Sequence, residues 1–165
     1  MEITPSQDIE KISSISFSIM TEYFPGRSIL TPEQAEYLWL RTASPKRIAE
    51  RIEAGQQFFL LGEEDDLSRG VLGLQGVSKE GVYRITLLYI PKEHRGQGYG
   101  TRALAFVEDV ARMNRAQSLC LFVADRNQAA RDFYEHRGFK VGAFGLPFAM
   151  GNGLTLSDTL MIKVL

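Results

Sequence analysis

Residues Leu87–Thr101 read Leu-Leu-Tyr-Ile-Pro-Lys-Glu-His-Arg-Gly-Gln-Gly-Tyr-Gly-Thr. The β-rich start of this stretch predicts a strand, the three glycines predict a loop, and the residues that follow predict a helix. Such a junction directs backbone N–H groups and the positive end of a helix dipole at one place, which is a ready anion site. Glycine lets the backbone approach a bulky phosphate, and Arg95 adds a permanent positive charge at the rim.

Three other interpretations of this loop are a P-loop, a dinucleotide-binding loop and a glycine-rich turn without a ligand. A P-loop needs Lys and then Ser or Thr after its last glycine, but Gly100 is followed by Thr101 and Arg102. A dinucleotide fingerprint needs Gly-x-Gly-x-x-Gly and an acidic residue about twenty positions later. Here the spacing is Gly-x-Gly-x-Gly, and the later region, Leu119 to Val123, is apolar. The third interpretation is a glycine-rich turn that binds nothing, because short glycine motifs often match by chance.

Hydrophobic periodicity and turn residues place the other elements. Helices are expected over residues 5–23, where Pro25 and Gly26 interrupt the pattern, from the Thr31 N-cap onward, from Ser44 to Gly55, and over 98–115 and 127–137. Strands are expected over 58–61, 71–77, 82–90, 119–123, 139–144 and 155–164, with a charged turn at 63–69 and a tight turn at 79–81.

This order of elements predicts an α/β fold. The strands before and after the 79–81 turn are expected to form an antiparallel hairpin, and strands and helices then alternate to the end of the chain. A hairpin followed by such units indicates a central mixed β-sheet flanked by helices on both faces. No linker or repeat divides the sequence, so one domain over residues 1–165 is expected.

Composition excludes several classes of protein. The chain has 165 residues, of which 44% are hydrophobic and 24% charged, and its net charge of −1 gives no general attraction to nucleic acid or to an anionic membrane. Neither a spanning helix nor a signal peptide is expected. Cys120 is the only cysteine and lies in an apolar run, so it is expected to be a core residue in a protein of the reducing cytoplasm.

Two motifs together carry a family resemblance. Arg95-x-x-Gly98-x-Gly100 resembles the Gln/Arg-x-x-Gly-x-Gly/Ala signature of the GNAT acetyltransferase superfamily. Residues 127–139, Asn-Gln-Ala-Ala-Arg-Asp-Phe-Tyr-Glu-His-Arg-Gly-Phe, resemble that superfamily's second motif, Asn-x-x-Ala-x-x-Phe-Tyr-x-x-x-Gly-Phe. The resemblance implies the GNAT fold and direct transfer of an acetyl group from acetyl-coenzyme A to a primary amine of a small molecule or peptide, with no metal.

The flanking segments look most like the bacterial polyamine, or spermidine, acetyltransferase branch. They are Ser44–Phe59 and the Met150-Gly-Asn-Gly turn with Asp158. That branch often carries an acidic residue just before its Gly-Asn-Gly turn. The corresponding stretch here, Pro147-Phe148-Ala149-Met150, has no acid, which argues against a polyamine acceptor.

The resemblance also implies roles for individual residues. The strand end pairs with the pantetheine arm, the N–H of Leu88 stabilises the thioester carbonyl, and Tyr134 protonates the leaving thiolate, since a phenol with a pKa of about 10 can protonate a thiolate whose thiol has about 8.5. The glycine loop holds the pyrophosphate. The expected coenzyme-binding residues are Leu88, Tyr89, Ile90, Arg95, Gly96, Gln97, Gly98, Tyr99, Gly100, Thr101 and Asn127.

Structural roles compete with two of these assignments. Asn127 suits the N-cap of the helix that it opens, and Tyr134 suits simple packing beside Phe133. The base that deprotonates the amine stays open between Glu80, Glu93, Asp158 and water, while His94 and His136 are expected at the surface. Part of the acceptor pocket is expected from the first two helices and residues 146–156, with candidate lining side chains Tyr23, Phe24, Tyr37, Trp39 and Phe148.

Two further hypotheses belong to other functional classes. A coenzyme A-binding sensor without turnover would keep the glycine loop and dispense with the Tyr134 acid. A DNA-binding regulator is not supported, because no basic stripe is present. Resemblance to related enzymes implies a homodimer joined through a sheet edge or the C-terminal strands.

Overall fold

The computed structural model describes residues 1–27, 29–76, 78–79, 81–149 and 155–165. Their internal contacts divide the chain into two compact units, Met1–Gly76 with Ile85–Val107 and Val77–Arg84 with Glu108–Leu165. The predicted 79–81 turn, the Met150-Gly-Asn-Gly turn and the candidate base Glu80 lie wholly or partly outside the described residues. The expected single domain stays a prediction.

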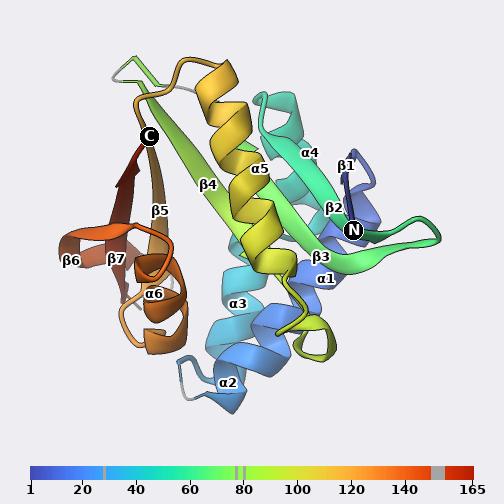
Figure 1. The fold of residues 1–165 in the computed structure, drawn as a ribbon. Coiled ribbons are helices and arrows are strands. Elements are labelled where there is room, and N and C mark those ends of the chain that lie inside the picture. The colour runs from blue at the N-terminus through green and yellow to red at the C-terminus, as the bar shows by residue number, and fades with distance from the viewer. Residues whose placement is uncertain (28, 77, 80, 150–154) are drawn as a thin grey trace. The chain divides into compact units, whose positions relative to one another are not determined.

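A seven-stranded sheet runs through the fold in the order β1-β2-β3-β4-β5-β7-β6 (Figure 1). Because β4 and β5 pair in parallel whereas the β1–β2, β2–β3, β5–β7 and β6–β7 pairs are antiparallel, the sheet is mixed, as predicted. The strands are β1 Glu2–Pro5, β2 Gln57–Glu63, β3 Asp66–Gln75, β4 Val82–Tyr89, β5 Ser118–Ala124, β6 Lys140–Ala149 and β7 Thr155–Val164.

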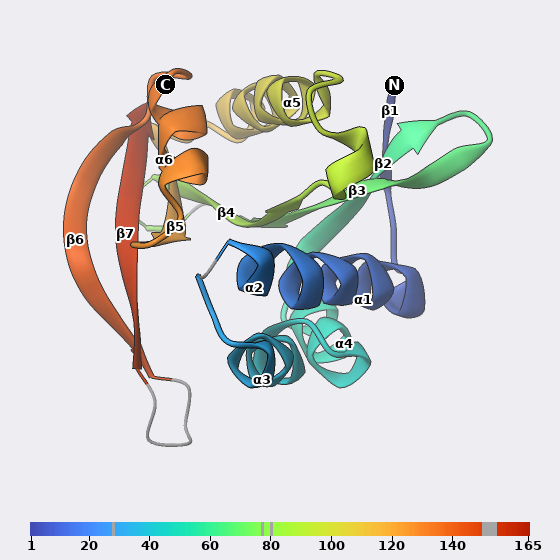
Figure 2. The same cartoon turned by 90° about the horizontal axis from the view of Figure 1, so that it is seen from below.

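Helices cover both faces of the sheet in the first unit (Figure 2). Phe58 and Leu60 of β2 pack with Ile12 and Ile48 in one core cluster, whereas Phe59 between them meets Phe106 on the other face at 5.1 Å between ring centroids. This alternation is what a strand buried on both faces requires. The helices are α1 Ile9–Ser18, a π-helical turn Ile19–Tyr23, α2 Phe24–Gly26, α3 Pro32–Thr42, α4 Pro45–Glu53, a 3₁₀ turn Lys92–His94, and α5 Tyr99–Met113.

Capping residues predicted the start of α3 and the end of α4 correctly. Thr31 and Gln34 form a reciprocal capping box, with Thr31 N donating to Gln34 Oε1 at 2.9 Å and Gln34 N to Thr31 Oγ1 at 3.2 Å. Gly55 follows α4 with φ of +84°, the left-handed conformation typical of a glycine after a helix.

The predicted start of the chain is wrong in two places. The strand β1, Glu2–Pro5, which pairs with β2, was not expected, and the helix expected from residue 5 begins only at Ile9. A strand of four residues is too short for an alternation of apolar and polar residues to be recognised, and its pairing partner lies far along the sequence. The helical path also continues through Pro25, which occupies a first-turn position of α2 that needs no N–H donor, and it ends at Gly26, the second of the two expected breaking residues.

The expected charged turn at 63–69 is also wrong, because most of it is strand. Glu63 pairs with Asp66, so only Glu64 and Asp65 turn the hairpin. Charged side chains lie at this exposed end of the hairpin, and their composition alone is typical of a loop.

The strand β6 is longer than expected, because it runs to Ala149 instead of Phe144. Register shifts between Val141 and Leu146 in its pairing with β7 explain the interrupted sequence pattern.

The second unit surrounds β5. Its neighbours are the first residues of β4 in parallel, over Val82–Arg84, and β7 in antiparallel register along its whole length. Helix α6, Gln128–Glu135, follows β5, and Tyr134 and Phe139 pack edge to face at 5.5 Å between centroids. Among the residues described, every helix is too short or too polar to span a bilayer.

Candidate functional site

The strand–loop–helix junction forms as predicted, within the first unit. Leu88 and Tyr89 end β4, the 3₁₀ turn follows Pro91, and α5 begins at Tyr99. The carbonyl of Gly98 accepts a helical hydrogen bond from Arg102 N at 3.0 Å, so Gly98 is the residue on which the helix starts. All the expected coenzyme-binding residues from Leu88 to Thr101 therefore belong to one continuous segment of one unit.

Two glycines of this loop adopt a conformation that other residues resist. Gly96 has φ of +76° and Gly98 φ of +85°. A Cβ built on either one meets no atom within 4 Å, and both residues are exposed. The loop therefore presents bare backbone to open space, directly before the N-terminus of a helix. N–H groups of a first helical turn have no carbonyl to bond within the helix, so this geometry suits an anionic ligand.

Arg95 is held in a fixed direction beside the loop. Its Nε donates to the carbonyl of Ile90 at 2.8 Å, and its guanidinium carbon lies 3.9 Å from the centroid of the Tyr23 ring. Burial lowers the pKa of Arg95, but a guanidinium remains protonated at neutral pH. The junction thus carries a permanent, oriented positive charge.

Tyr99 ties the start of α5 to the β2–β3 hairpin, a connection that the sequence did not reveal. The side chain is 4% exposed. Its hydroxyl donates to Glu63 Oε1 at 2.8 Å and accepts from Arg69 Nη1 at 2.8 Å. The hydrogen bond from Tyr99 lowers the pKa of Glu63. Because Tyr99 immediately follows Gly98, this network fixes where the glycine loop meets the helix.

Asn127 and Tyr134 belong to the second unit, and both have the structural roles considered for them. Asn127 is the N-cap of α6, where Oδ1 accepts from Ala130 N at 3.3 Å. Tyr134 is 8% exposed, and its ring packs edge to face on Phe133 at 5.1 Å and on Phe139 at 5.5 Å. Neither role excludes a second one, because both residues also carry polar atoms suited to a ligand. Their predicted contacts with the coenzyme stay predictions.

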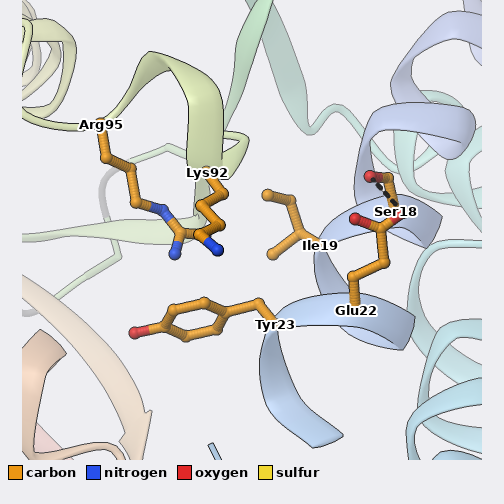
Figure 3. A pocket seen from close by; sticks show the side chains of 6 residues that line it. All are labelled: Ser18, Ile19, Glu22, Tyr23, Lys92 and Arg95. Carbon is orange, nitrogen blue, oxygen red and sulfur yellow. Dashed lines mark hydrogen bonds between the residues drawn. The ribbon is translucent and has the colours of Figure 1, made fainter. Parts of the chain in front are cut away.

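A pocket of about 210 Å³ lies between the π-helical turn and the 3₁₀ turn of the first unit (Figure 3). Lys92 in the 3₁₀ turn and Arg95 directly after it line one side, and the other side is lined by Ser18 at the end of α1 with Ile19, Glu22 and Tyr23 of the π-helical turn. Of the aromatic residues expected in an acceptor pocket, Tyr23 is thus in a pocket. Phe24 and Trp39 pack on the core cluster instead.

Comparison with known proteins now places the chain in a family. The sequence profile described as the acetyltransferase (GNAT) family matches residues 17–139. The chain belongs to the GNAT acetyltransferase family. It is 30% identical over 110 residues to the uncharacterized N-acetyltransferase YobR of Bacillus subtilis, a match that covers 63% of this chain and 43% of YobR. The chain spans about half the length of the curated relatives it matches, from 43% to 59%.

Solved structures share the fold of this GNAT chain over its whole length. A GCN5-related N-acetyltransferase from Rhodopseudomonas palustris matches with a TM-score of 0.82 and 21% identity, covering 99% of this chain and 95% of that one. The PaiA N-acetyltransferase of Thermoplasma acidophilum, crystallised in complex with coenzyme A, matches with a TM-score of 0.77 and 19% identity over 100% of both chains. The predicted GNAT fold is therefore confirmed, while nothing singles out the polyamine branch.

The candidate bases of this GNAT chain differ in their surroundings. Glu93 is exposed on the 3₁₀ turn. Asp158 lies in β7, where burial first and the neighbouring Asp125 second raise its pKa. Asp125 itself accepts hydrogen bonds from Ser157 and Thr159, which lower its pKa. Within the described residues, no group of three or more His, Cys, Asp or Glu side chains could hold a metal ion.

Asp158→Asn is expected to stabilise the fold at neutral pH. A carboxyl whose pKa is raised by folding opposes folding above that pKa, and has no effect below its unfolded value of about 3.9, where both states are protonated. We expect the melting temperature to rise by only about 1–2 °C at pH 7, since water screens a half-buried group, and not to rise near pH 3.

The control for this variant is Asp109→Asn, because Asp109 is an exposed carboxyl of α5. It should leave the melting temperature unchanged at both pH values when both are measured by calorimetry. A gain for Asp158→Asn that is equal at both pH values would contradict an electrostatic origin.

Proposed function

We propose that this chain transfers the acetyl group of acetyl-coenzyme A directly to a primary amine of a small molecule or peptide. The observation that carries the proposal is the pair of exposed glycines, Gly96 and Gly98, both with positive φ and open space beside them at the start of α5. In a GNAT chain this bare backbone fits a pyrophosphate, whose charge suits the helix N-terminus. The complex of the Thermoplasma PaiA protein with coenzyme A supports the choice of ligand.

Backbone atoms hold the coenzyme in this proposal. The N–H groups from Gly96 to Thr101 bind the pyrophosphate, and Arg95 adds positive charge at the rim. The strand end Leu88–Ile90 pairs with the pantetheine arm as an added β-strand would. Leu88 and Tyr89 are the last two residues of β4, so the proposed pairing uses the end of a strand.

The chemistry needs few side chains. Acetyl-coenzyme A supplies an activated acetyl group as its thioester. The N–H of Leu88 donates to the carbonyl oxygen as that oxygen gains charge. The amine nitrogen forms a bond to the carbonyl carbon, the carbon–sulfur bond breaks, and the Tyr134 hydroxyl gives its proton to the departing sulfur. The amine attacks in its neutral form, after an ammonium acceptor has given one proton to solvent, and the proton that its nitrogen loses as the amide forms passes through solvent to the Tyr134 oxygen and restores the acid. Asn127 supports the coenzyme from the start of α6.

Tyr99→Phe is expected to weaken coenzyme binding without slowing the chemical step, because Tyr99 is a positioning residue. Loss of its bonds to Glu63 and Arg69 should lower the free energy of unfolding by about 1–3 kcal/mol. Freer movement of the α5 start should raise the KM for acetyl-coenzyme A by roughly fivefold, equal to about 1 kcal/mol.

Glu63→Gln is the matched control, since an amide oxygen still accepts from the Tyr99 hydroxyl. It should change the KM for acetyl-coenzyme A far less than Tyr99→Phe does. An unchanged KM in Tyr99→Phe, or a lowered kcat with KM unchanged, would show that the network does not position the loop.

A screen for thiol release tests the proposed function. Purified chain is mixed with acetyl-coenzyme A and polyamines, other amines, amino acids or short peptides, and free coenzyme A is measured. Turnover with any amine above the rate without acceptor supports the enzyme. Tight binding of acetyl-coenzyme A with no turnover would instead indicate a sensor, and no binding would overturn the role of the glycine loop.

A further inference from the structure

The pocket beside the glycine loop carries more positive than negative charge. Lys92 and Arg95 contribute two cations from the 3₁₀ turn and the residue after it, whereas Glu22 is its one lining carboxylate. None of the ion pairs among the described residues involves Lys92 or Arg95. Two cations that share a small pocket lined by a single carboxylate favour an anionic ligand.

The charges are also separated across the pocket. Arg95 is fixed over the Tyr23 ring and bonded to Ile90, and it lies with Lys92 on one side (Figure 3). Glu22 lies on the opposite side with Ser18, whose hydroxyl donates to it at 3.4 Å. A ligand with an anion at one end and an amine at the other matches both sides.

We infer that the pocket binds the acetyl acceptor, and that this acceptor is a small amine carrying an anionic group, a carboxylate or a phosphate. The inference rests on the proposed function, because an amine bound here is an acetyl acceptor only if the chain transfers acetyl groups. The anionic end binds Lys92, with the charge of Arg95 adding attraction from the same side of the pocket, and the ammonium form of the amine is drawn toward Glu22. A polyamine fits poorly, because one of its ammonium groups must face the two cations.

Calorimetry on the chain loaded with coenzyme A tests the inference independently of turnover. Three ligands have an amine on a five-carbon chain and differ at the other end. That end is a carboxylate in δ-aminovalerate, a methyl group in pentylamine and an ammonium group in cadaverine. Aminobutylphosphonate distinguishes a phosphate-type anion from a carboxylate. We expect an anionic tail to bind at least about tenfold tighter than the neutral tail, and the cationic tail to bind most weakly.

Lys92→Gln should weaken the binding of the anionic ligands about tenfold and leave the affinity for pentylamine unchanged. Lys46→Gln is the control, because it makes the same charge change at an exposed position of α4 outside this pocket. Equal binding of all tails, or tightest binding of cadaverine, would overturn the inference. So would a Lys92→Gln effect on coenzyme A affinity with δ-aminovalerate unaffected, since the cations would then serve the coenzyme.

The same ligands in the thiol-release assay separate this inference from the proposed function. If cadaverine is acetylated best, the inference of an anionic acceptor is wrong, but the proposed acetyltransferase function is supported. If no amine is acetylated but Lys92-dependent binding of an anionic amine persists, the pocket assignment stands and the proposed function fails.

Discussion

Gly98→Ala is expected to weaken acetyl-coenzyme A binding by about 100-fold. The new methyl group would occupy the open space beside the loop, where the proposal places a phosphate. Two or more charge-assisted hydrogen bonds to backbone N–H groups would then be lost or lengthened, which corresponds to about 3 kcal/mol. The affinity is measured by calorimetry with the purified chain.

Gly55→Ala separates this effect from backbone strain. Gly55 has φ of +84°, against +85° for Gly98, and a Cβ at either position meets no atom within 4 Å. Both variants should therefore lose a similar amount of stability, about 1–2 kcal/mol, for placing an L-residue in the left-handed region. Only Gly98→Ala should lose coenzyme. Wild-type affinity in Gly98→Ala, or an equal loss in Gly55→Ala, would contradict a pyrophosphate site at this loop.

Tyr134→Phe is expected to lower kcat by about 10²- to 10⁴-fold, the usual contribution of a general acid, while the affinity for acetyl-coenzyme A stays within about twofold. The ring contacts with Phe133 and Phe139 remain possible in the variant, since only the hydroxyl is removed. Steady-state kinetics and calorimetry on the same preparation measure the two quantities.

Tyr83→Phe is the control for removal of a buried tyrosine hydroxyl. Tyr83 is 3% exposed and Tyr134 is 8% exposed, and both belong to the second unit. The two variants should lose comparable stability, about 1 kcal/mol, but Tyr83→Phe should keep its kcat. If Tyr134→Phe turns over at the wild-type rate, Tyr134 is a packing residue and the proton comes from elsewhere.

Local chemistry made several elements predictable from the sequence. The Thr31 capping box, the glycine after α4 and the glycines before α5 each act within a few residues, so the sequence alone specifies them. The strand β7 was predicted with its observed bounds, Thr155–Val164, because a long β-rich run at the end of the chain has no competing helical period.

Features that depend on distant partners were not predictable. The hydroxyl of Tyr99 meets Arg69 and Glu63, which lie 30 and 36 positions earlier in the sequence. The cationic pocket joins Lys92 and Arg95 to a π-helical turn more distant still. The only signal in the sequence is that two basic residues lie three positions apart, Lys92 in the 3₁₀ turn and Arg95 directly after it. It could not indicate what the two cations face.

Transfer of a labelled acetyl group tests the central claim most directly. The purified chain is incubated with acetyl-coenzyme A labelled in its acetyl carbons and with δ-aminovalerate, pentylamine or cadaverine, and the amines are analysed by mass spectrometry. Our account predicts a labelled amide that forms only with active chain, most rapidly on δ-aminovalerate, and far more slowly with Tyr134→Phe. Unlabelled amines in every sample, from a chain that is folded and binds acetyl-coenzyme A, would contradict it.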